Sequence, residues 1–287
     1  MKLYAISDLH LDHKENREAL EQLPAHPDDW LILAGDICAT TDQLDSVLDI
    51  FCQRFAHVIW VPGNHDLWVT TRMAHESSLQ KYERLIAICR QHGVSNPEDE
   101  FPLYRGEGGE HRIIPLNLLY DYSFRPDSVP VEGALNWAME AGILCQDERL
   151  IKPHPFASKL HWCRQRVAYS RQRLQYNQNL NADIPTVLVN HFPLRYDLVR
   201  IRRIPRFSIW CGTKASETWH QQYNATVVVS GHLHVRATDY KDGVRFEEVS
   251  LGYPRDWQRH KGIKHYLREI LPGPGINHHN AGPVWRI

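Results

Sequence analysis

The stretch VIWVPGNHD, residues 58–66, carries the clearest structural signal of this 287-residue chain. Residues 58–61 form a short apolar run, and a Pro-Gly pair closes it. A run of this length that is rich in Val and Ile and ends at Pro and Gly is typical of a buried β-strand rather than a helix. The pattern therefore places Asn64, His65 and Asp66 in a loop that leaves the C-terminal end of a strand.

The same arrangement occurs four more times along the chain. Apolar runs at residues 3–6, 30–34, 186–189 and 226–229 each precede a short polar motif. These motifs are Asp8-Leu9-His10, Gly35-Asp36, Asn190-His191 and Gly231-His232-Leu233-His234. In open α/β sheets the loops that leave the strand C-termini converge at one edge, where ligands bind. The sequence therefore predicts one site that is built from five loops.

These motifs supply donors that suit transition-metal ions. The candidate ligands are Asp8, His10, Asp36, Asn64, His191, His232 and His234. Oxygen and imidazole donors suit Mn, Fe, Zn or Ni, and no thiolate is needed. Seven groups are too many for one octahedral ion that keeps a position open for substrate, but they suit two ions if Asp36 bridges them. The glycines before Asp36, Asn64 and His232 are expected to let these turns close tightly, because glycine has no Cβ atom.

The pattern D-x-H, G-D, G-N-H-D, N-H and G-H-x-H resembles the calcineurin-like metallophosphoesterase superfamily, from Asp8 to about Tyr253. The resemblance implies an α/β fold, a four-layer α-β-β-α sandwich with two mixed sheets and a metal site at the C-terminal ends of the strands. It also implies how the ligands are shared between two metals. Asp8, His10 and His234 would hold one ion, Asn64, His191 and His232 would hold the other, and Asp36 would bridge them.

The resemblance further implies the chemistry. Two ions, with Mn²⁺ expected and Fe, Zn or Ni as alternatives, would hydrolyse phosphate esters through a metal-bridging hydroxide. Asp36 and His65 would be catalytic, with Asn64 and His65 contacting the substrate. His65 would not be a ligand but would protonate the leaving group. Asp66 would either orient a ligand or simply shape the turn.

One difference from the superfamily's pattern indicates which subclass to expect. Protein Ser/Thr phosphatases of this superfamily continue the G-D motif into a D-R-G signature, whereas residues 37–40 here read ICAT. A bacterial-type member is therefore expected rather than a protein phosphatase. The residues leave open whether the substrate is a phosphomonoester or a phosphodiester.

Composition limits the partners. The net charge of −1 gives no general attraction to nucleic acid or to acidic membranes. A small phosphorylated substrate is expected; a nuclease that relies on local arginine clusters and a scaffold of the same fold without activity are the alternatives. Six cysteines without C-x-x-C pairing, together with the lack of an apolar signal or membrane-spanning run, predict a cytoplasmic protein.

The chain is expected to divide into a metallophosphoesterase domain at residues 1–255 and a C-terminal extension at residues 256–287. Residues 97–180 would contain an insertion or cap-like segment. Helical periodicity predicts helices at residues 40–55 and 76–92. The insertion should contain a strand over residues 113–122 and lead into a basic helix over residues 156–179.

A cluster of five arginines follows the candidate ligand His191. Its members are Arg195, Arg200, Arg202, Arg203 and Arg206. One arginine side chain can donate hydrogen bonds to two oxygens of the same phosphate, so the segment could recognise the substrate. It could equally be a charged loop that is offset by nearby acids, because closeness in sequence to a ligand does not fix where a side chain points.

Overall fold

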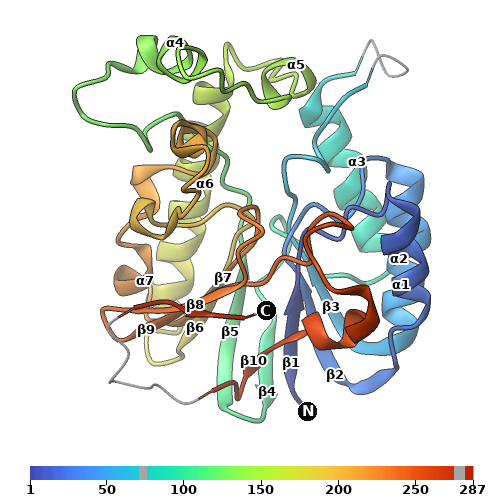
Figure 1. Cartoon of the computed structure of the whole chain (residues 1–287). Coiled ribbons are helices and arrows are strands. Elements are labelled where there is room, and N and C mark those ends of the chain that lie inside the picture. Colours follow the sequence, from blue (N-terminus) through green and yellow to red (C-terminus); the bar gives the residue numbers. More distant parts are fainter. Residues whose placement is uncertain (71–75, 275–281, 287) are drawn as a thin grey trace.

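The computed structural model describes residues 1–70, 76–274 and 282–286, and it contains two β-sheets that lie face to face (Figure 1). The first sheet has the strand order β10-β1-β2-β3, with β1, β2 and β3 parallel and β10 antiparallel to β1. Its strands are β1 (Leu3–Ile6), β2 (His26–Leu33), β3 (Phe55–Trp60) and β10 (Arg268–Leu271).

The second sheet has the order β11-β8-β9-β7-β6-β5-β4. Its centre is parallel, from β5 through β6 and β7 to β9, and its remaining strands pair antiparallel. The strands are β4 (Leu103–Gly106), β5 (Gly109–Pro115), β6 (Thr186–Val189), β7 (Ala225–Ser230), β8 (Ala237–Lys241), β9 (Val244–Glu248) and β11 (Val284–Trp285).

Alternating side chains of the parallel strands fill two cores. On β1, Leu3 and Ala5 lie in the core between the sheets, whereas Ile6 joins the core that packs against the helices. Val187 and Leu188 divide in the same way on β6. Because both faces of these strands are buried, they appear in the sequence as continuous apolar runs.

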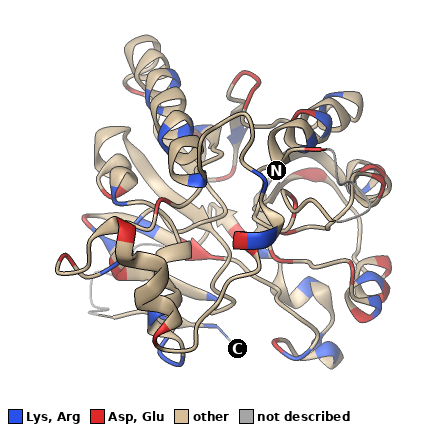
Figure 2. Cartoon of the chain, turned by 90° about the horizontal axis from the view of Figure 1, so that it is seen from above, with Lys and Arg blue, Asp and Glu red and all other residues tan. Residues whose placement is uncertain are grey.

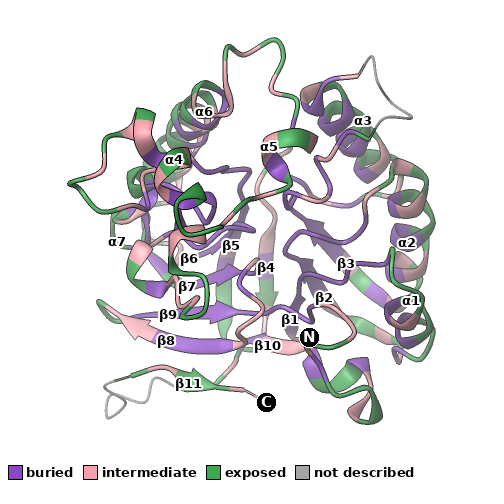
Figure 3. Cartoon of the chain, turned by 45° about the horizontal axis from the view of Figure 1, so that its top comes forward, coloured by how far each residue is buried: buried purple, intermediate pink, exposed green. Residues whose placement is uncertain are grey.

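Helices cover the outer face of each sheet, so the four-layer sandwich with two mixed sheets is confirmed (Figures 1 and 3). The first sheet carries α1 (Lys14–Glu21), α2 (Thr41–Arg54) and α3 (Ser78–Gln91), and the second carries α6 (Lys159–Leu180) and α7 (Trp219–Gln222). Two short helices, α4 (Ala134–Met139) and α5 (Asp147–Leu150), lie above the strand C-termini. Six 3₁₀ segments complete the described helices: η2 (Val131–Gly133), η3 (Tyr196–Leu198), η4 (Pro205–Trp210), η5 (Lys214–Ser216), η6 (Arg259–Lys261) and η7 (Ile263–Tyr266).

Capping side chains explain where the predicted helices begin. The Thr40 hydroxyl accepts a hydrogen bond from the backbone N–H of Gln43 at the start of α2. Ser77 and Gln80 form a reciprocal capping box at the start of α3. The helices predicted at residues 40–55 and 76–92 are confirmed within two residues at each end. The basic helix predicted over residues 156–179 is also confirmed, as α6, which begins three residues later than predicted.

The strand predicted over residues 113–122 is wrong in its second half. β5 ends at Pro115, where its partner β6 also ends at Val189. Beyond this point residues 116–122 stay largely buried as a loop, and the side-chain oxygen of Asn190 accepts a hydrogen bond from the Leu118 N–H. The apolar pattern therefore reported burial, not strand pairing.

Residues beyond 255 contribute a strand to each sheet, β10 to the first and β11 to the second. The division at residue 255 and the cap-like character of residues 97–180 stay proposals. His75, His278 and His279, which belong to none of the five motifs, lie outside the described residues.

A buried carboxylate ties these late strands to the second sheet. Glu247 on β9 is fully buried and forms ion pairs with Arg245, Arg268 and Arg286 at 3.2, 2.7 and 2.7 Å. It also accepts a hydrogen bond of 2.7 Å from the Thr238 hydroxyl. Since Arg268 lies on β10 and Arg286 directly follows β11, Glu247 joins the C-terminal segment to both sheets.

Replacing Glu247 by Gln should lower the free energy of unfolding by about 3 kcal/mol, because it leaves three largely buried guanidinium groups without their counter-charge. Chemical denaturation measures this loss. Glu269→Gln is the control, since it removes an acid from the same region that pairs with Lys2 at a partly exposed site. Equal effects of the two substitutions would contradict the anchoring role of Glu247.

Candidate metal centre

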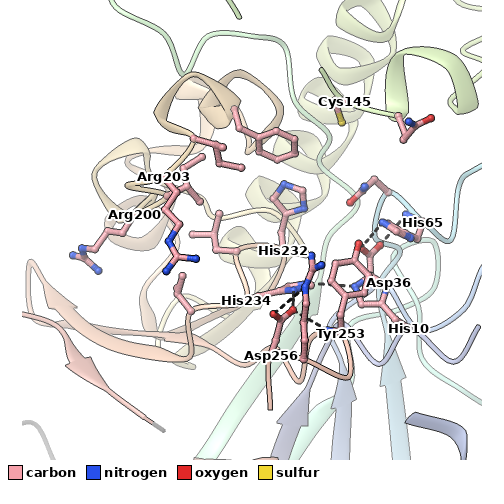
Figure 4. A pocket seen from close by; sticks show the side chains of 18 of the residues that line it. His10, Asp36, His65, Cys145, Arg200, Arg203, His232, His234, Tyr253 and Asp256 are labelled. Carbon is pink, nitrogen blue, oxygen red and sulfur yellow. Dashed lines mark hydrogen bonds and ion pairs between the residues drawn. The ribbon is translucent and has the colours of Figure 1, made fainter. Parts of the chain in front are cut away.

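The five motif loops meet where the C-terminal ends of the parallel strands of both sheets come together (Figures 1 and 4). Asp8, His10 and His234 form one group there. The Nε2 atom of His234 lies 3.1 Å from Asp8 Oδ1 and 3.2 Å from His10 Nε2. Their potential ligand atoms all lie within 4.8 Å of one another, as binding of a common cation requires.

A second group surrounds Asp36. The Nε2 atom of His191 lies 3.2 Å from Asn64 Oδ1 and 3.5 Å from Asp36 Oδ2. Asp36 also belongs to potential metal-binding triplets with His10 and His65 and with Asp8 and His191. Its carboxylate therefore lies between the two groups, which is the position that a bridging ligand needs.

His232 tests whether the site fits a metal. Its ring lies 5.2 Å from that of His191, and its Nε2 atom is buried without a hydrogen-bond partner among the described residues. A buried polar atom without a partner is costly, and native proteins rarely contain one. A cation would satisfy this nitrogen, so the residues present fit a metal.

Hydrogen bonds from behind fix two of the imidazoles. Nδ1 of His191 lies 2.9 Å from the Ala34 carbonyl oxygen, and Nδ1 of His234 lies 2.9 Å from Asp256 Oδ2. Because a carbonyl oxygen only accepts, Nδ1 of His191 donates to Ala34, and its Nε2 atom is the one that faces the site. Burial disfavours the charged form of His191, but the charges of Asp36 and Asp8 and the hydrogen bond to the backbone raise its pKa to about 9.

Burial and charge set the protonation of these groups. Burial lowers the pKa of His10 and of His232 to about 3, so both are neutral at neutral pH. Burial also disfavours the charged form of His234, but hydrogen bonds with Asp256 and Asp8 raise its pKa to about 10. A cation would replace such a proton, because a metal-bound imidazole offers its lone pair.

Strained backbone is concentrated in these loops. Asp8, His10, Asp36, His232 and His234 have φ angles of 53°, 42°, 54°, 72° and 53°, in the left-handed region that residues with a Cβ atom seldom adopt. Each such residue costs on the order of 1–3 kcal/mol and persists only where its surroundings enforce it. Strain at five of the seven candidate ligands is what a functional site produces.

The glycines expected to allow close approach do so. A Cβ atom on Gly63 would collide with the Asp36 carboxylate, and one on Gly231 would collide with the carboxylate of Asp8. Gly35 has a φ of 89°, and a Cβ atom there would lie 2.6 Å from Nδ1 of His191. These loops therefore need glycine for space.

Asp66 shapes the loop that carries the central carboxylate. Its buried side chain accepts hydrogen bonds from the backbone N–H groups of Asp36, Ile37, Cys38 and Gly63. It thereby fixes the backbone of Asp36 from behind, as expected for a supporting residue.

His65 lies at the edge of the group. Its ring stacks on Trp68 at a centroid distance of 3.6 Å, and its Nε2 atom lies 3.8 Å from Asp36 Oδ2. The side chain is 14% exposed and lines the cavity above the carboxylates. It can therefore reach both Asp36 and a bound substrate.

Asp147 and Asp256 belong to the site but did not emerge from the sequence. The Oδ1 atom of Asp147 accepts hydrogen bonds from Asn64 Nδ2 at 3.1 Å and from Trp68 Nε1 at 2.6 Å. This contact turns the Asn64 amide so that its oxygen faces the metal-binding groups. Asp256 lies 22 residues after His234, and no motif in the sequence marks it as a partner of that histidine.

A cavity of about 820 Å³ opens from these groups toward the arginine cluster (Figure 4). Arg200, Arg202 and Arg203 line it, as do Tyr253 and Trp285. Its wall on this side is largely apolar and is formed by Ile201, Ile204, Phe207, Leu233 and Val235.

Comparisons with known proteins show to which family and to which relative this chain is similar. Residues 1–236 match the family model described as calcineurin-like phosphoesterase. The "[Acyl-carrier-protein] phosphodiesterase PptH" of Mycobacterium tuberculosis is 46% identical over 276 residues, which cover 95% of this chain and 84% of that protein. The crystal structure of phosphopantetheinyl hydrolase (PptH) from M. tuberculosis superposes with a TM-score of 0.89 at 45% identity, over 95% of this chain and 96% of that one.

Replacing Asp147 by Ala should weaken Mn²⁺ binding about 10- to 100-fold, because the Asn64 amide loses the acceptor that orients it. Calorimetric titration of the metal-free protein with Mn²⁺ measures this. Asp147→Asn is the matched control: Oδ2 has no hydrogen-bond partner among the described residues, so an amide can keep the oxygen acceptor and replace only Oδ2. Equal losses in both variants would show that the charge of Asp147 matters rather than its acceptor.

Proposed function

We propose that this chain, which belongs to the calcineurin-like phosphoesterase family, hydrolyses the phosphodiester that joins a phosphopantetheinyl arm to an acyl carrier protein. Its family makes the chain a metal-dependent phosphoesterase, and its relative in M. tuberculosis is a phosphodiesterase rather than a protein phosphatase. The observation that carries the proposal is that the candidate ligands lie at one end of a cavity with an apolar wall. Such a wall suits a long and largely uncharged arm.

The ligand assignment is part of this proposal. Asp8, His10 and His234 would hold one ion, Asn64, His191 and His232 the other, and Asp36 both. This assignment is supported by the closely spaced donor atoms of the two groups that meet at Asp36. It is also supported by the Nε2 atom of His232, which has no hydrogen-bond partner among the described residues. Two divalent cations bound there, with Mn²⁺ expected, would supply an acidified water as nucleophile and would polarise the phosphate oxygens.

The protein's own groups would complete the reaction. Asn64 and His65 lie beside Asp36 on the cavity side, where they can contact a phosphate oxygen. His65 would hold a proton on Nε2 and pass it to the oxygen that leaves phosphorus, while Trp68 keeps its ring in place by stacking. Hydrolysis would release the carrier protein and the phosphorylated arm.

We propose that the protein is located in the cytoplasm. All six cysteines lie in the described ranges, and each is a free thiol. Among the described helices, none combines the length and the apolar character needed to cross a membrane.

The proposal is tested by incubating the full chain and Mn²⁺ with a carrier protein that bears its phosphopantetheinyl arm. Intact-mass spectrometry should show loss of the arm, and a chelator should abolish the reaction until Mn²⁺ is restored. Asp36→Asn, which weakens contact with both ions, should be inactive. A chain that cleaves single-stranded DNA or phosphomonoesters but not the carrier would contradict the proposed substrate, and a chain without any metal-dependent hydrolysis would be a scaffold.

His65→Ala should retain its metal and lose about 10²- to 10⁴-fold in rate on esters with poor leaving groups, because a positioned acid contributes that much. The loss should be much smaller for bis-p-nitrophenyl phosphate, since p-nitrophenolate leaves without a proton. Metal analysis and rates on an alkyl and a nitrophenyl diester measure both effects. Loss of metal, or equal loss of rate on both esters, would show that His65 is a ligand or a contact of the non-leaving oxygens instead.

A further inference from the structure

The structure separates the arginine cluster into two classes. Arg195, Arg200 and Arg206 are held by acidic side chains, at distances of 2.9, 2.6 and 3.1 Å. Their partners are Asp197, Asp239 and Glu140. Arg200 is bidentate, with both of its terminal nitrogens on Asp239 of β8. These three charges are therefore used within the protein.

Arg202 and Arg203 are different. Both are exposed, both line the cavity, and neither forms an ion pair or a side-chain hydrogen bond within the described part of the chain. Figure 4 shows Arg203 on the opposite side of the cavity from Asp36 and His65. They therefore place two positive charges at the rim of the cavity that no acid of the described residues offsets.

The overall charge of the chain does not account for these two cations. The chain has a net charge of −1, and ribbon segments with basic residues and with acidic residues are both spread over the molecule in the view from above (Figure 2). Of the acids that line the cavity, Asp36 lies in the metal centre and Asp256 is bound to His234. Arg202 and Arg203 thus give the rim a local positive charge on a nearly neutral protein.

The position of the bond to be cleaved determines what meets this rim. A phosphodiester between an arm and a carrier protein lies directly against the carrier's surface. When the phosphate reaches the metal centre and the arm lies along the apolar wall, the carrier must lie over the mouth of the cavity. Exposed cations at the mouth fit a charged macromolecular surface better than a small enclosed anion, which would need buried donors.

We propose that Arg202 and Arg203 form a docking surface for an acidic patch beside the modified residue of the carrier protein. This inference rests on the proposed function. Rim charges of this kind act mainly on encounter and orientation, so they govern the Michaelis constant for the protein substrate and its salt dependence more than the chemical step.

The test is the double variant Arg202→Glu/Arg203→Glu, assayed at saturating Mn²⁺ on the arm-bearing carrier and on bis-p-nitrophenyl phosphate. The KM for the carrier should rise about tenfold or more with kcat retained, whereas hydrolysis of the small diester should change by less than about twofold. Added NaCl should raise the KM of the wild type and lower that of the charge-reversed variant, because salt screens both attraction and repulsion between exposed charges. Arg202→Gln/Arg203→Gln should give an intermediate KM.

Arg164→Glu/Arg171→Glu is the matched control, since both residues are exposed on α6, away from the cavity lining, and the charge change is the same. Its KM for the carrier should equal that of the wild type. An unchanged KM in the rim variant, or an equal loss on carrier and small diester, overturns the docking surface and leaves the proposed function intact. A wild-type chain that cleaves the small diester but no carrier overturns both.

Discussion

Burying two carboxylates side by side is the constraint on which the site depends. Asp8 and Asp36 are almost inaccessible to solvent, and like charges at this depth require compensation by hydrogen bonds and cations. Oδ2 of Asp8 accepts hydrogen bonds from the Ser7 hydroxyl, the Ser250 hydroxyl and the backbone N–H of His232. Its Oδ1 atom faces His234. The left-handed backbone, the glycines and the surrounding imidazoles follow from bringing these two side chains together.

Segments outside the parallel strands hold this arrangement from behind. Asp147 comes from α5 and orients Asn64, while Asp256, which follows β9, fixes His234. Glu247 anchors the C-terminal segment through its ion pair with Arg286. The neighbouring Trp285 lines the cavity. The segments that carry Asp147 and Asp256 are therefore structural parts of the candidate centre, because each supplies a contact that the five loops lack.

The candidate ligands could be predicted because each lies in a loop that directly follows one of five strands, so the local sequence determines both the position and the chemistry. Asp147 could not, since it lies 83 residues from Asn64 and only the folded chain brings the two together. The role of the arginines in the cluster could not be predicted for the same reason. Asp239, which neutralises Arg200, is 39 residues away in the sequence. Burial without strand pairing at residues 116–122 was also beyond a periodicity argument, because an apolar pattern reports only which side chains avoid water.

The shape around the centre bears on the choice between monoesters and diesters that the sequence left open. A monoester needs space on one side of phosphorus only, whereas a diester has a substituent on each of two oxygens. The centre lies at one end of a cavity of about 820 Å³ whose apolar wall can hold one substituent. Its mouth, where Arg202 and Arg203 are exposed, leaves the other free to be part of a protein. One cavity therefore offers an apolar wall and an exposed charged rim, which are unlike environments for the two unlike substituents of a diester.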